Sequence, residues 1–390
     1  MSRKGGNNEG SIRKRSNGLW EARVTVGRNS CSRQVQKSIY GKTRSEVSAK
    51  MNEILGQLNT DTYISPSVMT VAEWMKNWLQ TYAKTNLRPS SYASCEGHVF
   101  NHIIPHIGDI PLSKLTTENV QRFYNKEYSG GAGLSAKTVR NIHITLRRAL
   151  QQAVDNKIIS YNCCGSVILP KREKKEMRVL SREEQAAVMS VIPNERLGFA
   201  ILFDLSTGLR IGELCGLKWS DFDLVNKTFN VKRTLQRVKL PEGQVTANGD
   251  TTMIVEGKVK TDNGYREIPI QDKVFAELMK YKERQGEEKD WAGCAYTDND
   301  YVFASPIGGC VEPSTMRDMF NRLLCNAKVK HANFHSLRHT FATRAIEAGV
   351  PVKAVSEILG HASIQITLDL YCHASIEMKR DAVNRMSDLW

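Results

Sequence analysis

The polar residues with the most informative spacing lie between positions 335 and 371. His335, Arg338 and His339 stand at i, i+3 and i+4, so on a helix their side chains share one face. His361 follows a glycine, and Tyr371 comes ten residues later. This short segment therefore gathers a guanidinium that can bind an anion, imidazoles that can transfer protons, and a phenol.

Each of these residues also has a purely structural interpretation. A single histidine or tyrosine most often completes a hydrogen-bond network or a packing surface. His335 and His339 have the i, i+4 spacing of zinc ligands, but Ser336 stands where the metalloprotease motif has glutamate. We therefore expect no metal here, and it is the order of the whole set that indicates chemistry.

Helices are predicted to position this set. An apolar stripe lies behind the polar face of the first helix: Phe341, Ala342, Ala345 and Ile346. Gly349 and Pro351 predict where this helix ends and the next one begins, and Gly360 predicts a second break. The polar cluster and a packing face thus belong to the same helix.

The composition indicates a polyanionic partner. The 390 residues carry a formal net charge of +14 and are expected to form two or three domains. The nine cysteines contain no C-x-x-C pair, and neither a signal peptide nor a long apolar run opens the chain. We expect a reduced, soluble, intracellular protein with no membrane segment, and nucleic acid is the first candidate partner.

Basic residues are concentrated at the N-terminus, where residues 1–60 hold twelve Lys and Arg against four Glu. Alternating runs over 18–26 and 32–40 predict strands, and Thr43 with Glu46 predicts a capped helix. We expect a mobile arm, then a small basic three-stranded sheet with one helix behind it. Its basic side chains either form a DNA-binding face or lie on a solvated surface, and both interpretations remain open. These side chains are Arg13, Arg15, Arg23, Arg33 and Lys37.

From 70 to 161 the apolar spacing becomes helical. Helices are predicted to begin near four positions, Thr70, Pro89, Thr116 and Ser135. The segment is therefore expected to form a four-helix domain. Three basic residues of the last helix lie off its apolar stripe and are candidates for phosphate contacts: Arg140, Arg147 and Arg148. The charged stretch 170–177 then reads as an extended linker.

A larger mixed domain is expected beyond residue 180. Gly208 permits a tight turn into a helix, which places Arg210 at the helix start with Glu213 one turn on. Arg210 in this position can bind an anion or can form a structural salt bridge with Glu213.

Strands follow in this domain, over 228–238 and 253–260. The Asn263-Gly264 pair predicts a hairpin turn between the second of these strands and the run 265–270. Lys260, just before the turn, is either a solubilising charge at a sheet edge or an ammonium that reaches into a neighbouring cleft.

Taken in order, these motifs resemble the tyrosine recombinases, the phage-lambda-integrase family, and are most like the integrases of conjugative transposons and temperate phages. The matching residues are Arg210 in T-G-L-R-x-x-E-L, Lys260 before the turn, His335 and Arg338 in H-x-L-R-H, His361 in L-G-H, and Tyr371. The resemblance covers nearly the whole chain, and no catalytic position is missing. It implies a multidomain α+β fold: a basic N-terminal three-stranded sheet plus helix, a helical core-binding domain, and a mixed, mainly helical catalytic domain with a small β-sheet.

The resemblance implies that Tyr371 attacks a DNA phosphate, leaving a 3′-phosphotyrosyl link and a free 5′-hydroxyl. Arg210 and Arg338 are then expected to bind the non-bridging phosphate oxygens. Neither ATP, nor a metal, nor another cofactor is needed for this reaction.

Proton transfer is assigned by the same resemblance. His335 is the expected base for the phenol, and Lys260 is the expected acid for the leaving 5′-oxygen. His361 is expected to donate a further hydrogen bond, whereas we interpret His339 as a structural residue.

The layout and the family together imply double-stranded DNA as the partner, both at the element ends and at a target site. A homo-tetramer is expected to exchange strands through a Holliday junction, with an excisionase or a DNA-bending factor as a further partner, on the nucleoid in the bacterial cytoplasm. A tail helix over 375–390 is expected to dock on a neighbouring protomer or on its own domain. The expected divisions are an arm-type DNA-binding domain, a core-binding SAM-like domain, a linker and a catalytic domain: 1–62, 68–165, 166–179 and 180–390.

Two other functions remain open. A type IB topoisomerase-like enzyme shares this chemistry and relaxes supercoils as a monomer, but a separate basic N-terminal domain is not expected for it. A DNA-binding regulator built on a recombinase scaffold is expected to have lost part of the polar set. That set is complete in this chain: Arg210, Lys260, His335, Arg338, His361 and Tyr371.

Overall fold

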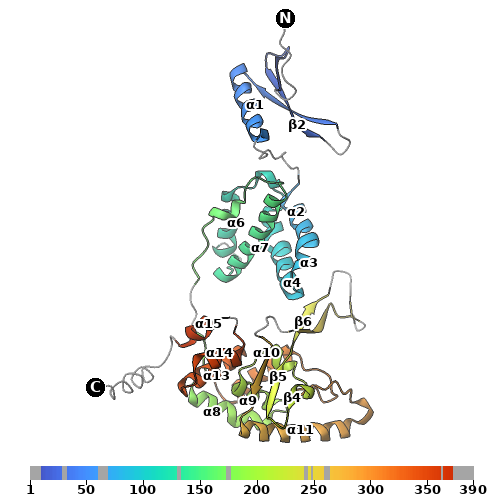
Figure 1. Cartoon of the computed structure of the whole chain (residues 1–390), viewed down its shortest axis with the longest axis vertical. Helices are drawn as coiled ribbons and strands as arrows, with labels where there is room; N and C mark the ends of the chain where they lie inside the picture. The colour runs from blue at the N-terminus through green and yellow to red at the C-terminus, as the bar shows by residue number, and fades with distance from the viewer. Residues whose placement is uncertain are drawn as a thin grey trace, which may run out of the picture. The chain divides into compact units, whose positions relative to one another are not determined.

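The computed structural model is shown in Figure 1. Contacts divide the chain into two compact units, Met1–Glu173 and Lys174–Trp390, and each unit is described by itself. The residues that the structure describes are 10–28, 33–59, 69–129, 133–172, 177–240, 245–246, 249–258, 264–361 and 363–371.

The first unit begins with a three-stranded antiparallel sheet in the order β1-β2-β3, followed by one helix. Its elements are β1 (Ser11–Lys14), β2 (Trp20–Arg28), β3 (Gln34–Gly41) and α1 (Arg44–Asn59). One face of the sheet packs on α1 through a small core: Ala22, Val24, Ile39, Val47 and Met51. The predicted sheet and helix are confirmed. The alternation did not locate β1, because this strand has only four residues and three of them are exposed.

The rest of the described first unit is helical, and the four predicted helices are present. The first runs from α2 (Val71–Trp78) through the π-helical η1 (Leu79–Ala83) into α3 (Lys84–Asn86). The second runs from α4 (Pro89–His98) through the π-helical η2 (Val99–Ile103) into α5 (Ile104–Ile107). There follow η3 (Leu112–Lys114), α6 (Thr117–Ser129), α7 (Ala136–Asp155) and η4 (Cys163–Ser166). The buried Trp74 ties the first helix to the last, since its Nε1 donates to Ala149 O at 2.9 Å.

The second unit is mainly helical. Its helices are α8 (Arg182–Val191), η5 (Ile192–Asn194), α9 (Gly198–Thr207), α10 (Ile211–Cys215), η6 (Trp219–Asp221), α11 (Asp272–Ala292), η8 (Gly293–Ala295), α12 (Pro313–Asn326), α13 (His335–Glu347), α14 (Val352–Leu359) and α15 (Ile364–Tyr371). Its strands are β4 (Phe222–Asp223), β5 (Thr228–Val231), β6 (Arg233–Lys239), β7 (Thr252–Lys258) and β8 (Arg266–Pro269). Among the residues that the structure describes, no helix has both the length and the apolar character needed to cross a membrane.

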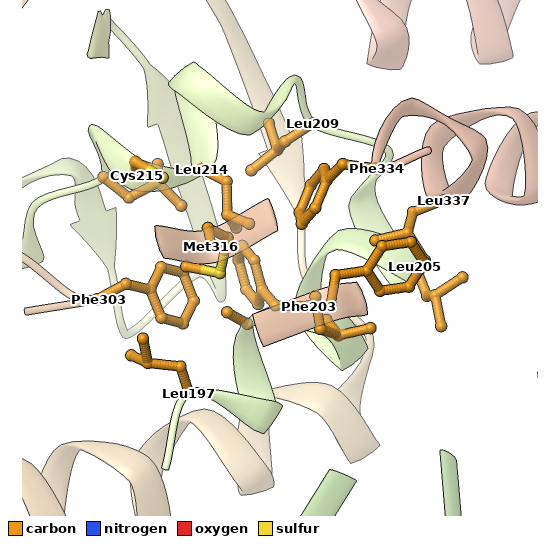
Figure 2. Close-up of a cluster of buried hydrophobic side chains, with 14 of the residues drawn as sticks. Leu197, Phe203, Leu205, Leu209, Leu214, Cys215, Phe303, Met316, Phe334 and Leu337 are labelled. Carbon is orange, nitrogen blue, oxygen red and sulfur yellow. The ribbon is translucent and has the colours of Figure 1, made fainter. Parts of the chain in front are cut away.

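The core of the second unit is built around α9. Its Phe203 is fully buried, and the ring lies 6.1 Å from that of Phe303. Figure 2 shows Leu209 continuing this core beyond α9, and Phe334 and Leu337 entering it from the start of α13. Burying one such side chain contributes on the order of 2 kcal/mol. The core therefore fixes the chain around Leu209 against the start of α13, which is where the predicted polar set lies.

The hairpin predicted at 261–264 is wrong. β7 pairs with β6, whereas β8 pairs with β5 in the sheet β4-β5-β8, so the strands on either side of the predicted turn are not partners. Lys258 lies opposite Arg233, and Arg266 lies opposite Val231. β5 and β6 therefore act almost as one strand that pairs with β8 and β7 in turn. A local turn signal cannot reveal this, because pairing across the sheet decides the register.

Candidate active site

Three consecutive backbone carbonyls at the end of α14 hold three arginines. The carbonyls are those of Ile358, Leu359 and Gly360. Arg266 Nε donates to the first at 2.5 Å, Arg338 Nη2 to the second at 2.5 Å, and Arg210 Nη2 to the third at 3.2 Å. The carbonyl end of a helix carries the negative end of its dipole and favours cations. The end of α14 therefore collects guanidiniums that lie far apart in the sequence.

Arg338 is the buried member of this set, with 2% of its surface exposed. Its Nη1 donates to Gly208 O at 2.7 Å. Gly208 has a φ of +64°, and a Cβ at this position would lie 2.5 Å from Phe341 Cδ1, so glycine is required here. Burial and the neighbouring charge of Arg210 lower the pKa of Arg338 to about 9, which leaves it protonated at pH 7. Both hydrogen bonds go to neutral carbonyls, which do not neutralise the charge.

Arg210 stands just before α10, and its side chain is 42% exposed. Its Nη1 lies 2.7 Å from Glu213 Oε1, so the salt bridge that the sequence allowed is present. Glu213 is buried, and its Oε2 accepts from Arg266 Nη2 at 2.9 Å. Burial acts to raise the pKa of Glu213, but Arg266 and Arg210 hold it below its usual range. Glu213 thus fixes Arg210 at the surface, where part of the guanidinium is open to an anion.

Three histidines lie near these guanidiniums. The rings of His335 and His339 meet edge to face with centroids 4.5 Å apart, and His361 Nδ1 lies 2.8 Å from Thr367 Oγ1. Burial lowers the pKa of all three imidazoles, to about 4 for His339 and His361, and the charge of Arg338 lowers each of them further. They are therefore neutral at pH 7, and each can accept a proton or donate one hydrogen bond.

Two predicted site residues fall at the limits of the described chain. Lys260 lies in 259–263, outside the described residues. Tyr371 is the last residue of α15, which packs against α13 and α14, and its side chain is outside the description. The predicted tail helix over 375–390, the N-terminal arm and part of the linker also lie outside the described residues.

Sequence reasoning missed Arg266, Asp204 and Thr367. Asp204 is fully buried in α9, and neither of its carboxyl oxygens has a hydrogen-bond partner in the described part of the chain. Burial raises its pKa well above the usual range, although Arg338 acts to lower it. A lone acid inside the apolar run 199–205 was the available signal. Within the described ranges, no group of three or more His, Cys, Asp or Glu could hold a metal ion.

A second arginine cluster covers the outer face of the N-terminal sheet. Glu21 lies at its centre and is inaccessible to solvent. Its Oε2 accepts from Arg13 Nε at 2.7 Å and from Arg15 Nε at 3.0 Å. Its Oε1 accepts from Arg23 Nε and from Tyr40 Oη, each at 3.2 Å. The hydrogen bonds from the three arginines, that of Arg15 first, lower the pKa of Glu21.

The other predicted DNA-contact residues are placed differently. Lys37 lies opposite the buried Val24, so it stands on the α1 side of the sheet, and the prediction of one shared basic face does not hold for it. Arg140 Nε donates to Pro170 O at 3.0 Å, which gives this arginine a structural partner. The remaining three are exposed: Arg33, Arg147 and Arg148.

Comparison with known proteins connects this geometry to a family. The phage integrase family matches residues 178–378, and the phage integrase N-terminal SAM-like domain matches residues 70–128. The chain is 32% identical over 377 residues to a tyrosine recombinase XerC-like protein of Caldanaerobacter subterraneus, and the match covers 94% of this chain and 95% of that protein.

Two solved structures share the fold. The Tn1549 transposon integrase in complex with circular intermediate DNA matches with a TM-score of 0.66 and 23% identity, covering 82% of this chain and 100% of that chain. A lambda integrase tetramer bound to a Holliday junction matches with a TM-score of 0.58 and 18% identity, covering 94% of this chain and 96% of that chain. Both likenesses extend over most of the sequence.

Proposed function

The chain belongs to the phage integrase family of tyrosine recombinases, enzymes that break and rejoin DNA, and on this premise we propose that it inserts or excises a mobile element by site-specific recombination. The observation that carries the proposal is the meeting of two arginines and three neutral imidazoles at the end of α14, against which the helix ending in Tyr371 packs.

Tyr371 is the proposed nucleophile. Its phenolic oxygen bonds to the scissile phosphorus, and the bond to the 5′-oxygen of the next nucleotide breaks. The resulting 3′-phosphotyrosyl bond conserves the energy of the phosphodiester, so a 5′-hydroxyl from another duplex can reverse the step and complete an exchange. Two such exchanges, one pair of strands at a time, pass through a Holliday junction.

Arg210 and Arg338 are proposed to bind the two non-bridging oxygens of this phosphate. Negative charge on these oxygens grows as the phosphorus becomes five-coordinate. Arg210 meets it from the surface, and Arg338 brings a charge that its carbonyl partners leave uncompensated. Loss of one such charged donor costs about 3 kcal/mol, roughly a hundredfold in rate.

Proton transfers are proposed for His335 and Lys260. A phenol has a pKa of about 10, so a base must take its proton. His335 is neutral because partial desolvation of its ring and the charges of Arg338 and Arg210 lower its pKa, and the residue still keeps exposed surface at the start of α13. Lys260, in the segment between β7 and β8, is the proposed acid for the leaving 5′-oxygen. Thr367 faces Nδ1 of His361, so Nε2 is the ring nitrogen left to hydrogen-bond a phosphate oxygen.

The other parts of the chain are proposed to bind and organise DNA. Residues 1–62 bind arm-type sites at the element ends. The crossover site is bound by the helical domain, 68–165, and by the catalytic domain, 180–390, which the linker 166–179 joins. Four copies assemble on two duplexes, with the tail over 375–390 docked on a neighbouring protomer and an excisionase or a DNA-bending factor as a further partner. Supporting this, the lambda integrase neighbour is a tetramer on a Holliday junction, and the Tn1549 neighbour is bound to circular intermediate DNA.

Nicked suicide duplexes drawn from the ends of the element that carries this gene test the proposal. The full-length chain is expected to form a protein–DNA adduct that survives denaturation, appears without magnesium and requires element-end sequence. Tyr371→Phe should abolish the adduct, and Arg210→Lys should slow it. Tight binding of element ends without any adduct from the wild-type chain would instead favour a DNA-binding regulator.

A further inference from the structure

Arg266, the first residue of β8, lies at the centre of the network behind the candidate site. Its side chain is only 7% exposed. Nε donates to Ile358 O at 2.5 Å, Nη1 to Gly264 O at 3.0 Å and Nη2 to Glu213 Oε2 at 2.9 Å. All three guanidinium nitrogens therefore have partners within the protein. Unlike Arg338, whose partners are neutral carbonyls, Arg266 is paired with a carboxylate that compensates its charge, so it is less suited than Arg338 to bind a DNA phosphate.

The partners of Arg266 also hold Arg210. Glu213 Oε1 accepts from Arg210 Nη1 at 2.7 Å, and Gly360 O, two residues after Ile358, accepts from Arg210 Nη2 at 3.2 Å. A closed ring of contacts thus joins Arg266, Glu213, Arg210 and the end of α14. Hydrogen bonds from two nitrogens fix the plane of a guanidinium as well as its position. A displacement of Arg266 therefore reaches Arg210 from two sides.

We propose that Arg266 is a positioning residue for strand cleavage, which holds Arg210 in its phosphate-binding orientation without touching DNA. Its backbone is anchored in the sheet, because Arg266 lies opposite Val231 of β5. The side chain connects that sheet to α10 through Glu213 and to α14 through Ile358. The inference rests on the proposed function, since only cleavage reports the orientation of Arg210.

Arg266→Lys tests this role in the full-length chain. Lysine keeps the charge, but one ammonium cannot reproduce the arginine fork. On a nicked suicide duplex at saturating protein, we expect the rate of adduct formation to fall about 30-fold while the Kd for the duplex stays within about twofold. A merely structural role would lower the fraction of active protein and leave the single-turnover rate of the folded fraction unchanged.

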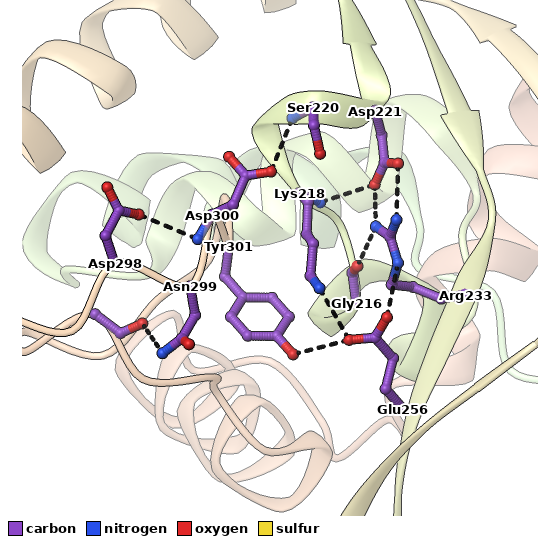
Figure 3. A network of polar contacts seen from close by, with 11 residues as sticks. Gly216, Lys218, Ser220, Asp221, Arg233, Glu256, Asp298, Asn299, Asp300 and Tyr301 are labelled. Carbon is purple, nitrogen blue, oxygen red and sulfur yellow. Dashed lines mark hydrogen bonds and ion pairs between the residues drawn. The ribbon is translucent and has the colours of Figure 1, made fainter.

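Arg233→Lys is the matched control. Arg233 also lies largely buried in the second unit, where its Nη2 donates to the buried Asp221 at 3.1 Å and its Nη1 to Gly216 O at 3.3 Å (Figure 3). In the part of the chain that the structure describes, no partner of Arg233 is shared with Arg210 or Arg338. We expect this variant to lower the thermal unfolding midpoint about as much as Arg266→Lys, and to leave the adduct rate within about twofold of wild type.

A double-mutant cycle with Arg210→Lys identifies the route of the effect. If Arg266 acts through Arg210, adding Arg266→Lys to Arg210→Lys costs less than about threefold. Full additivity, an unchanged rate in Arg266→Lys, or an equal loss in Arg233→Lys overturns the inference. If Arg266→Lys does not fold, Arg266→Gln, whose amide still donates two N–H groups, takes its place in the cycle.

A wild-type chain that forms no Tyr371 adduct refutes the proposed function, and the inference with it. A wild-type adduct together with an unaffected Arg266→Lys rate refutes only the inference.

Discussion

Two arginine clusters in this protein each contain a buried glutamate, Glu21 in one and Glu213 in the other, and they differ because one arginine of the second cluster, Arg338, is held by carbonyls instead. On the N-terminal sheet, three arginines surround the carboxylate of Glu21 and remain 40–56% exposed: Arg13, Arg15 and Arg23. At the end of α14, Arg338 is 2% exposed and binds two neutral carbonyls. A carboxylate fixes guanidiniums while cancelling part of their charge, whereas carbonyls fix them and leave the charge intact. We expect the first arrangement to serve the proposed DNA-binding surface of the sheet, and the second to serve the proposed cleavage site, where negative charge develops in the transition state.

The largest expected effect comes from the buried cluster. Arg338→Lys keeps a positive charge, but a lysine cannot reach both Gly208 O and Leu359 O. We expect adduct formation on a suicide duplex to slow by about a hundredfold or more. Arg344→Lys is the control on the same helix, because Arg344 Nη2 donates to Leu180 O at 2.8 Å away from the site. Equal losses in the two variants would show that the effect belongs to α13 as a whole.

Changes in the arginine cluster of the N-terminal sheet should alter the preference of the protein for element-end DNA. Glu21→Gln removes the negative charge that holds the arginines in place, and Glu53→Gln removes an exposed negative charge from α1. The net charge of the protein therefore rises by one in both variants. In a Tyr371→Phe background, we expect Glu21→Gln to bind scrambled duplex more tightly and to lose about tenfold in its preference for element-end duplex. Glu53→Gln should keep its preference. If both variants lose the same amount of preference, Glu21 affects DNA binding only through the net charge and not by positioning the arginines.

Lowering the pH should destabilise the region around the end of α14 at a higher pH than it destabilises the N-terminal sheet. The pKa of His339 and of His361 is about 4 in the folded protein, below the value near 6.5 of an unfolded chain. The unfolded state therefore binds more protons below pH 6.5, and stability is lost as the pH falls through that value, on the order of 1 kcal/mol for each imidazole by pH 5. Glu21 has a lowered pKa, so its contribution is lost only as the pH falls below its usual value of 4.5.

Segment-resolved hydrogen exchange at pH 7 and pH 5, corrected for intrinsic rates, measures this difference. Opening should become more frequent in α13 and α14 and stay unchanged in β2 and β3. Faster opening of the sheet alone would reverse the assignment of the titrating groups.

The smallest effect is expected on α7. Arg147 is exposed, whereas Arg140 is bound to the Pro170 carbonyl. Arg147→Ala should weaken DNA binding a few-fold and reduce the slope of log K against log salt by about 1, as loss of one phosphate contact does. Arg140→Ala should leave that slope unchanged. A reduced slope for Arg140→Ala would mean that this arginine leaves Pro170 when DNA binds.

Local signals were enough to predict the helices that carry the site. The spacing of His335, Arg338 and His339, with Gly349 and Pro351 as boundaries, gives α13 and the start of α14 as observed. Such signals depend on neighbours within a turn or two of helix. For the same reason, the four helices of the first unit were predictable from their capping residues.

The remaining features depend on contacts between distant residues. Arg266 and Ile358 are 92 positions apart, and Arg338 and Gly208 are 130 apart, so no pattern within one segment indicates either hydrogen bond. The pairing of β7 with β6 was missed for a similar reason. The Asn-Gly pair indicates a local turn, whereas the strand with which β7 pairs is decided by contacts with β6, which is distant in the sequence. The face on which Lys37 lies likewise follows from its pairing with Val24.

The proposed cleavage chemistry is tested most directly by identifying the residue that becomes linked to DNA. The adduct from a suicide duplex would be denatured, digested with nuclease and protease, and sequenced by tandem mass spectrometry. We expect one 3′-phosphonucleotide linked to Tyr371 in the wild-type chain, and the same link, formed more slowly, in Arg266→Lys. A link to any other residue, or an adduct that persists in Tyr371→Phe, would contradict the proposed chemistry.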